Sequence, residues 1–368
     1  MSSSIRSEKV FVAMSGGVDS SVAAALLKKQ GYNVTGVFMR PWQPPVDNRH
    51  SMSVIHRCLW QKDREDAMKV AAKLGIPLLT WDFSKGYKRE VADYMIREYR
   101  AGRTPNPDVM CNKYIKFGLF LEKALKEGAD YIATGHYIKI KNVKIKRQND
   151  NSKFKIIYKL FQARDKNKDQ SYFLWTLTQK QLKYCLFPLG DYIKPKIRRM
   201  AKKFGLSTAN KKDSQGVCFV GSLDMKEFLK NYIKPKRGRI LDIDKKLVGY
   251  HDGVFYYTIG QRHGLDIKNG KGPYYVVDKD IKKNIIYVGG ESDLRENKVK
   301  VRDISWINDE LKFPIQINAK IRYRSKSAIV VLSKNGNLTF KKSSRAITSG
   351  QSVVFYRSDE LVGGGILL

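Results

Sequence analysis

The sequence predicts an α/β domain built on a parallel sheet, followed by one or two small β-barrels. The first observation is an alternation of apolar β-type runs with helical segments between Val10 and His136. Such alternation is typical of a parallel sheet covered by helices. The second is a change of pattern beyond Cys218, where short β-type runs are separated by Gly, Asn and Asp, as in small barrels. The third is the length of 368 residues, which exceeds one ordinary domain.

The elements of the first domain follow from hydrophobic periodicity and from the residues that end helices. Residues 40–60 contain Pro41, Pro44 and Pro45 and are expected to form a loop. Ligands of parallel sheets bind at the carboxyl ends of the strands, so we expect a site at the glycine turn after the first strand. We expect strands at residues 10–14, 32–39, 76–82 and 130–136, and helices at 21–29, 62–74, about 86–100 and 119–125.

Residues 139–159 are strongly basic and alternate as a β-hairpin does. A cationic hairpin of this kind suits contact with RNA and a solvated insertion equally well. Residues 169–206 return to helical periodicity. Further strands are expected at residues 253–257, 274–277, 285–288, 298–301, 315–317, 328–332 and 352–356.

The charge balance favours a polyanionic partner. The chain carries 70 Lys and Arg against 35 Asp and Glu, a formal net charge of +35, which attracts nucleic acid. The alternative explanation of the excess charge is a biased use of lysine, in which many lysines only solvate helix faces. No apolar run approaches the roughly 20 residues of a membrane span, and the first nine residues lack a secretory core. We therefore expect a cytoplasmic protein.

A glycine turn, Ser15–Gly16–Gly17–Val18–Asp19–Ser20, joins the first strand to the first helix. Glycines let the backbone approach an anion, and the first helical turn directs unpaired N–H groups at it. Serine hydroxyls add donors, and Asp19 is placed to hold Mg²⁺ on bound phosphates. The spacing matches neither the Walker loop nor the dinucleotide fingerprint. The alternative is a capped helix after a Gly-Gly turn.

Two of the four cysteines lie in distinctive surroundings. Cys111 follows the proline-stiffened stretch Asn106–Pro107–Asp108, just before a predicted helix whose N-terminal field favours thiolate. Cys218 lies between a glycine and an aromatic residue, after paired lysines. Taken alone, each is better explained by a buried structural cysteine. No Cys-x-x-Cys pair is present, so neither zinc nor an iron–sulfur cluster is expected.

Taken together, three motifs resemble those of the tRNA-specific 2-thiouridylases, a family of the PP-loop ATP pyrophosphatases. They are SGGVDS at residues 15–20, NPDVMCN at 106–112 and DSQGVCFVG at 213–221. Further matches lie at 134–137, 168–173, 258–262, 322–324 and 350–352, so the resemblance covers roughly residues 8–368. It implies an adenine nucleotide alpha hydrolase-like catalytic domain at 1–215, a central β-rich domain at 216–288 and a C-terminal β-barrel at 289–368.

The resemblance also implies roles for individual residues. ATP would adenylate the C2 oxygen of the anticodon wobble uridine. Cys218 would carry a persulfide, Cys111 would act as the nucleophile that resolves it through a Cys111–Cys218 disulfide, and Asp108 would be the acid/base. The implied ATP-binding residues are Ala13, Met14, Ser15, Gly16, Gly17, Val18, Asp19, Ser20, Met39 and Gly135. The implied tRNA-binding residues are Asn106, Pro107, Asp108, His136, Lys168, Asp169, Gln170, Arg322, Tyr323 and Gln351.

The expected cofactors are ATP and Mg²⁺, with no resident metal. The expected partners are tRNA, with Lys, Glu and Gln acceptors, and a cysteine desulfurase or sulfur-relay protein that supplies sulfur to a monomeric enzyme. Two other hypotheses remain. An amidating ligase would share the glycine turn without needing the two cysteines, and a non-catalytic RNA-binding protein would release no pyrophosphate.

Overall fold

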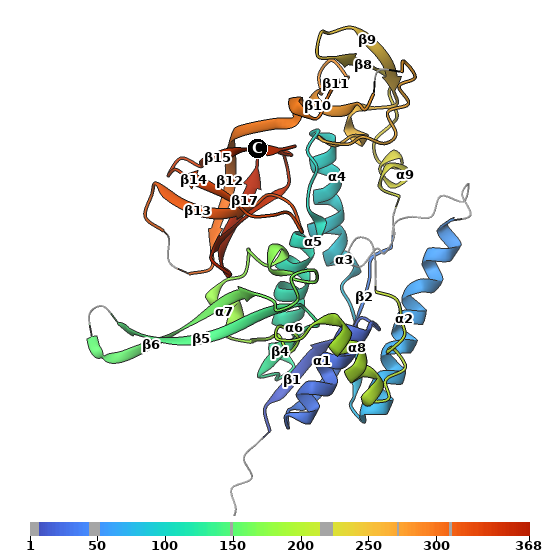
Figure 1. Cartoon of the computed structure of the whole chain (residues 1–368). Helices are drawn as coiled ribbons and strands as arrows, with labels where there is room; N and C mark the ends of the chain where they lie inside the picture. The colour runs from blue at the N-terminus through green and yellow to red at the C-terminus, as the bar shows by residue number, and fades with distance from the viewer. Residues whose placement is uncertain (1–6, 44–51, 148–149, 214–223, 271, 309–310) are drawn as a thin grey trace, which may run out of the picture. The chain divides into compact units, whose positions relative to one another are not determined.

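The computed structural model describes residues 7–43, 52–147, 150–213, 224–270, 272–308 and 311–368, with the side chains of 52–59, 146–147 and 150–153 left out (Figure 1). The chain divides into two compact units. The first comprises Met1–Val91, Asp108–Ser222 and Asp359–Val362. The second comprises Ala92–Pro107, Leu223–Ser358 and Gly363–Leu368. No described helix is long and apolar enough to cross a membrane.

A parallel five-stranded sheet with the order β3-β2-β1-β4-β7 forms the centre of the first unit. Strand β1 lies between β2 and β4, with Val12 opposite Gly36 on one side and Ala133 on the other. The chain turns to opposite sides of β1 at this point, and the crevice at such a switch point is where ligands bind. The strands are β1 (Lys9–Ala13), β2 (Asn33–Arg40), β3 (Leu78–Asp82), β4 (Tyr131–Ala133) and β7 (Cys185–Leu186).

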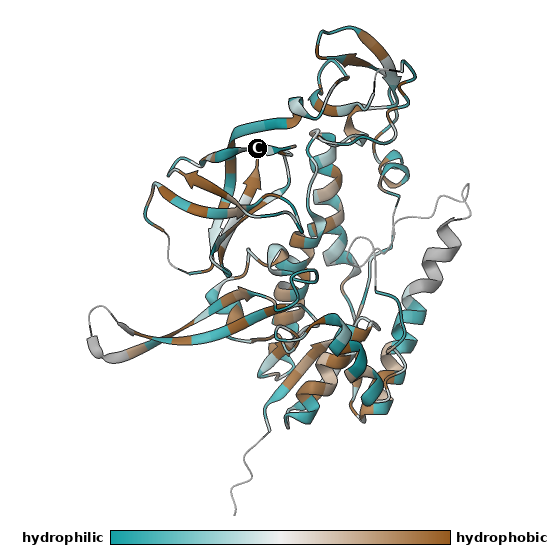
Figure 2. Cartoon of the chain, viewed as in Figure 1, coloured by the Kyte–Doolittle hydropathy of each residue, from teal (hydrophilic) through white to brown (hydrophobic). Residues whose placement is uncertain are grey.

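The predicted α/β class is confirmed by the helices that accompany this sheet. Apolar residues of β1 and α1 form one buried core, shown in brown in Figure 2. Helix α1 is apolar along nearly its whole length, with Val22, Ala23 and Ala24 fully buried. The helices of the unit are α1 (Val18–Lys29), α2 (Met52–Leu74), α3 (Ser84–Tyr87), α5 (Pro107–Met110), α6 (Phe120–Lys126), α7 (Gln179–Leu182) and α8 (Lys194–Lys203), with π-helical turns at Lys88–Ala92 and Cys111–Leu119 and a 3₁₀ turn at Ser171–Phe173.

Two of the predicted segments differ in the structure. Residues 52–60 of the expected loop are helical, because α2 begins at Met52 and no Pro or Gly interrupts the sequence from there to Leu74, while residues 44–51 lie outside the described residues. Residues 169–206 are not continuously helical, because Pro188 and Gly190 interrupt them. This region instead supplies β7, which pairs with Ile132 and Ala133.

A long antiparallel hairpin, β5 (Ile138–Arg147) and β6 (Asp150–Gln162), follows β4 directly. Its register runs from Ile138 opposite Gln162 outward, and Figure 1 shows both strands extending well beyond the five-stranded sheet. The predicted hairpin is therefore present and longer than expected. At its base, Leu160 pairs with Leu361.

The second unit contains two antiparallel-rich β assemblies and confirms the predicted β-rich domains. One is a sheet with the order β10-β11-β8-β9, and the other is a six-stranded barrel closed by pairing of β12 with both β15 and β17. The strand expected at 253–257 is instead a 3₁₀ turn, Val254–Tyr256, preceded by Gly253 at φ +147°. The elements are α4 (Asp93–Arg100), α9 (Met225–Lys230), β8 (Gly238–Asp242), β9 (Leu247–His251), β10 (Tyr275–Asp280), β11 (Ile285–Gly289), β12 (Arg295–Trp306), β13 (Ile315–Lys320), β14 (Ala328–Leu332), β15 (Asn337–Arg345), β16 (Ser352–Arg357) and β17 (Glu360–Leu367).

Candidate functional site

The glycine turn after β1 requires glycine at its second position, because of both its conformation and a close backbone contact. Gly16 has φ +71°, and a Cβ there would lie 2.1 Å from the carbonyl oxygen of Asp63. Hydroxyl groups hold the rest of the turn: Ser20 Oγ accepts from the Ser15 amide at 3.2 Å and donates to Gly17 O at 3.1 Å. Helix α1 begins at Val18, so its unpaired first-turn amides follow the turn directly. This arrangement suits an anion.

The other predicted nucleotide-binding residues lie along the same edge of the sheet. Gly135, after β4, approaches α1 so closely that a Cβ would lie 2.8 Å from the Ser20 amide nitrogen. Met39 is buried near the carboxyl end of β2, and the Met14 amide donates to Val37 O of that strand at 2.8 Å. The structure therefore brings together the ends of β1, β2 and β4, as expected for a switch point.

Sequence reasoning missed the partners of Asp19, which are Tyr137 and Lys194. The Tyr137 hydroxyl donates to Asp19 Oδ1 at 2.7 Å. Lys194 Nζ, at the start of α8 with a side chain only 10% exposed, donates to both Asp19 carboxylate oxygens at 2.8 and 2.7 Å. Burial, reinforced by Asp19, raises the pKa of Tyr137 far above its ordinary value. Asp19 is thereby fixed in orientation at the first turn of α1.

Lys194 also connects Asp19 to Asp213, the last described residue before the segment that contains Cys218. Lys168 and Arg198 donate to the same carboxylate. Burial alone raises the pKa of Asp213, but hydrogen bonds from Lys168 and Lys194 hold it at about 2. This carboxylate is therefore ionised near neutral pH and balances a cluster of three cations.

Lys211 provides a second connection to the glycine turn. Its amine donates to Gly16 O at 3.0 Å and to carboxylates of Asp63 and Asp66 on α2, at 2.7 and 2.6 Å. Burial lowers the pKa of Lys211, but the bonds to the two aspartates outweigh burial and raise it. The amine is a fixed positive charge beside the turn.

Three predicted tRNA-binding residues make mostly internal contacts in the first unit. His136 is 5% exposed, its ring packs against Phe117 and Phe187, and burial lowers its pKa well below the ordinary value. Asp169 is buried and accepts from the Ala163 amide at 2.9 Å. Gln170 Oε1 accepts from the Tyr137 amide at 3.0 Å.

The predicted sulfur-transfer residues are described only in part. Asn106, Pro107 and Asp108 are half-buried where α5 begins, and Cys111 is fully buried one turn further along. Cys218 lies outside the described residues, so the predicted Cys111–Cys218 disulfide stays a prediction. Burial raises the pKa of the Cys185 thiol far above its ordinary value, which suits a structural residue on β7.

The remaining predicted residues belong to the second unit. One Arg322 guanidinium nitrogen donates to Ala346 O at 2.8 Å and to Thr348 Oγ1 at 2.9 Å. Gln351 Nε2 donates to the carbonyl oxygens of Thr104 and Pro105, at 2.9 and 3.2 Å. The guanidinium carbon of Arg324 lies 5.0 Å from the centroid of the Tyr323 ring. Arg322 and Gln351 therefore hold loops of this unit together.

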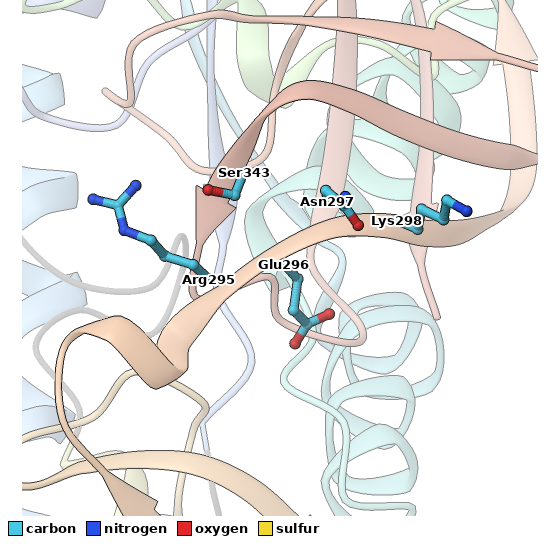
Figure 3. A pocket seen from close by; sticks show the side chains of 5 residues that line it. All are labelled: Arg295, Glu296, Asn297, Lys298 and Ser343. Atoms are coloured by element: carbon cyan, nitrogen blue, oxygen red, sulfur yellow. The ribbon is translucent and has the colours of Figure 1, made fainter.

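An open groove of about 470 Å³ on β12 and β15 also belongs to the second unit (Figure 3). It contains none of the residues predicted to act in binding or catalysis. Burial and the nearby charge of Asp278 raise the pKa of Glu296 in its wall. The residues that line the groove are Arg295, Glu296, Asn297, Lys298 and Ser343.

The site fits Mg²⁺ only when bound phosphates supply the remaining ligands of the ion. Among the described residues, no group of three or more His, Cys, Asp and Glu side chains could hold a metal ion. One carboxylate, Asp19, lies at the glycine turn, and Mg²⁺ commonly takes one or two carboxylates together with substrate phosphates. Since Lys194 and Tyr137 already donate to Asp19, an arriving ion would share this carboxylate with them or displace one of them.

Comparisons with known proteins cover nearly the whole chain. Three family models match in order: a tRNA methyl transferase HUP domain at residues 8–222, a tRNA methyl transferase PRC-barrel domain at 226–290 and an aminomethyltransferase beta-barrel domain at 296–367. A tRNA-specific 2-thiouridylase MnmA of Mycoplasma mycoides is 47% identical over 98% of each chain. The protein of the same name from Geobacillus thermodenitrificans is 45% identical over 98% of this chain and 94% of its own.

Solved structures resemble the chain only distantly. A 4-thiouridine synthetase in complex with RNA and ATP has a TM-score of 0.32 and 19% identity, over 58% of this chain and 45% of its own. An NMN synthetase from Francisella tularensis has a TM-score of 0.31 and 16% identity, over 57% of this chain and 67% of its own. Similarity at this level supports no conclusion about function.

Proposed function

Because the chain belongs to the family of tRNA-specific 2-thiouridylases, we propose that the glycine turn, Asp108, Cys111 and Cys218 together replace the C2 oxygen of the wobble uridine with sulfur. The 2-thiouridylase activity on tRNA and the use of ATP follow from membership of the family. The domain names refer to a methyl transferase, but near-full-length identity of 45–47% to thiouridylases is the more specific evidence. The proposal concerns which residues carry out each step.

In the first step, the C2 oxygen of uridine attacks the α-phosphorus of ATP, and pyrophosphate leaves. The amides of Gly17 to Ser20 and the N-terminus of α1 would bind the phosphates, where they stabilise negative charge that develops during the attack. Lys194 and Lys211 add fixed positive charge at the same turn. Mg²⁺, held by Asp19 and the phosphates, would supply further charge stabilisation. Ala13, Met14, Met39 and Gly135 would contact the nucleoside.

In the second step, the terminal sulfur of a Cys218 persulfide attacks C2, and the bond from C2 to the adenylate oxygen breaks to release AMP. The Cys111 thiolate then attacks the Cys218 sulfur, which leaves the transferred sulfur on C2 and forms a Cys111–Cys218 disulfide. A thiol reductant must reopen that disulfide before the next turnover. Asp108 would move the uridine N3 proton, with Asn106 and Pro107 shaping the pocket.

The partners follow the same reasoning. The tRNA substrate would carry its wobble base out of the anticodon loop, where extrusion costs little. We propose His136, Lys168, Asp169, Gln170, Arg322, Tyr323 and Gln351 as residues that bind tRNA or hold the loops that do. A cysteine desulfurase or sulfur-relay protein would load Cys218. We propose that the enzyme acts as a monomer in the cytoplasm, on tRNA with Lys, Glu or Gln acceptors.

The proposal is tested by the nucleosides of tRNA incubated with the protein, ATP, Mg²⁺ and a desulfurase with cysteine. Mass spectrometry of the digest should show 2-thiouridine with the wild type and not with Cys111→Ser or Cys218→Ser. Pyrophosphate released without thiouridine in all three proteins would contradict these roles for the cysteines. Activity that survives Cys218→Ser would assign the persulfide to another residue.

A further inference from the structure

We propose that the β5–β6 hairpin, here called the arm, binds tRNA directly along its exposed strands, with lysines on both of its faces in reach of phosphates. This inference builds on the proposed function, because it assigns a second RNA-binding surface to an enzyme whose substrate is tRNA. Three features of the described residues carry it: where the arm is attached, its uncompensated charge, and the apolar side chains exposed on it.

The two ends of the arm are attached at the phosphate-binding edge of the sheet. Strand β5 begins at Ile138, directly after Tyr137, whose hydroxyl bonds to Asp19. Strand β6 ends at Gln162, and the next amide, that of Ala163, donates to Asp169. An RNA that presents a base at this edge would therefore lie next to the base of the arm.

The arm is long enough to reach nucleotides outside the site. Its register continues unbroken from Ile138 opposite Gln162 to Ile145 opposite Lys155, eight residue pairs that span about 25 Å at 3.3 Å per residue. Gln179 of α7 pairs with both backbone groups of Tyr158, at 2.8 and 2.7 Å. Beyond Tyr158, β5 is the sole strand that pairs with the described part of β6.

Most of the described lysines of the arm form no ion pair with another described residue. Residues 138–162 contain eight Lys and Arg and a single acidic residue, Asp150. Lys159 forms an ion pair with Glu360 at 3.1 Å near the base of the arm. Lys144 and Lys155 are exposed, and neither forms an ion pair with a described residue. Lys144 is on β5 and Lys155 is on β6, and exposed lysines without an ion pair to a described residue attract phosphates.

Apolar side chains accompany these lysines on the arm. Phe154 is 56% exposed and Ile156 is 49% exposed, and both lie on one face of β6 because strand residues two apart share a face. Lys144 lies directly opposite Ile156 in the register and shares that face, whereas Lys155, opposite Ile145, lies on the other face of the hairpin. Figure 2 shows apolar and polar segments alternating along both strands. A base can stack on the ring of Phe154 while a lysine contacts the neighbouring phosphate, as in proteins that bind single-stranded RNA.

A role of the lysines in protecting the strand edge predicts different behaviour from a role in binding tRNA. Lysines also protect an exposed strand edge from pairing with another copy of the chain. In that case their removal would change self-association and leave tRNA binding unaltered. A neutral apolar partner would account for Phe154 and Ile156 but not for the exposed lysines Lys144 and Lys155.

The test compares two double variants with the same change in net charge. Lys144→Glu with Lys155→Glu alters the arm, whereas Lys29→Glu with Lys126→Glu alters two exposed lysines in the last turns of α1 and α6. Binding of unmodified substrate tRNA to the full chain would be measured by fluorescence anisotropy at salt concentrations from about 50 to about 300 mM. We expect the arm variant to bind at least tenfold more weakly at about 0.1 M salt, with a salt slope lower by about 1.4, since each single-strand phosphate contact contributes about 0.7. The control should change by less than about threefold.

Phe154→Ala tests stacking separately, and we expect affinity for tRNA to fall by about fivefold or more with an unchanged salt slope.

Equal effects of the arm and control variants would overturn the proposal. Wild-type affinity for tRNA in an arm variant that self-associates would also overturn it. The binding assay involves no chemistry, so it remains valid if the wild type fails to make thiouridine. With saturating tRNA the arm variant should retain kcat, and a loss of kcat there would contradict a role limited to binding.

Discussion

Lys194 donates to both carboxylate oxygens of Asp19, at 2.8 and 2.7 Å, although 175 positions separate the two residues in sequence. The amine lies beside the turn that we propose binds the phosphates of ATP. Since the Lys194 side chain is mostly buried, its removal leaves Asp19 and Asp213 without a shared cation.

Lys194→Met should therefore abolish most ATP-dependent turnover. We expect the KM for ATP to rise by about tenfold or more, and a loss of stability of about 3 kcal/mol from two carboxylates left with fewer partners. Steady-state release of pyrophosphate and denaturant unfolding measure the two effects. Lys196→Met, on the same helix, is the control and should behave as the wild type. An unchanged KM for ATP in a folded Lys194→Met protein would refute a role at the phosphates.

Tyr137→Phe removes a single hydrogen bond to Asp19 and leaves the ring in place. We expect stability to fall by about 1 kcal/mol and turnover to fall by about tenfold, because Asp19 loses one of the groups that orient it. Tyr131→Phe is a matched control, since its hydroxyl makes only a long, exposed bond of 3.5 Å to Glu8. If both variants turned over ATP equally fast, the hydroxyl of Tyr137 would have no role in orienting Asp19.

Asp213→Asn should destabilise the protein in a pH-dependent way. The pKa of Asp213 is about 2 in the folded protein and near 3.8 ordinarily, so its charged form stabilises the fold by about 2 kcal/mol above pH 4. That contribution is lost as the pH falls from about 4 through 2. The difference in free energy of unfolding between wild type and variant should therefore be largest near neutral pH and shrink below pH 4. A difference that stays constant across this range would contradict the ion-pair account.

Gly16→Ala should disrupt the turn more than its backbone conformation alone explains. The left-handed φ costs an alanine about 1 kcal/mol, and the new methyl group would also collide with Asp63 O. Gly31→Ala separates the two effects, because Gly31 has φ +92° and a methyl group there would meet nothing within 4 Å. We expect Gly31→Ala to lose about 1 kcal/mol with full activity, and Gly16→Ala to lose more stability and nearly all activity. Similar losses in both variants would show that the close approach at Gly16 is unimportant.

The sequence predicted those parts of the fold that local pattern controls. Alternation from Val10 to His136 was sufficient for the parallel sheet, because each strand and helix carries its own periodicity. The two-residue strand Cys185–Leu186 was missed, since a segment that short is defined by its pairing with Ile132 and Ala133 rather than by any pattern of its own. The prediction of a strand at Val254–Tyr256 was wrong, because the apolar run of this turn resembles that of a strand.

The sequence predicted the glycine turn of the site but not the network of ion pairs and hydrogen bonds around it. The glycines and Asp19 are contiguous, so their spacing was informative. Lys194, Lys211 and Asp213 act through contacts with residues far away in sequence, and lysines are too frequent in this chain for any one of them to stand out. The one available signal was Pro195 beside Lys194, because proline in the first turn marks a helix N-terminus.

The most direct test of the central claim follows the oxygen atom that leaves the uridine. A tRNA with ¹⁸O at C2 of the wobble uridine would be thiolated in unlabelled water, and the AMP and pyrophosphate would be analysed by mass spectrometry. Attack of the C2 oxygen on the α-phosphorus predicts one ¹⁸O atom in AMP for each thiouridine formed, and none in pyrophosphate. Unlabelled AMP alongside a normal yield of thiouridine would contradict the adenylate mechanism and the function assigned to the glycine turn.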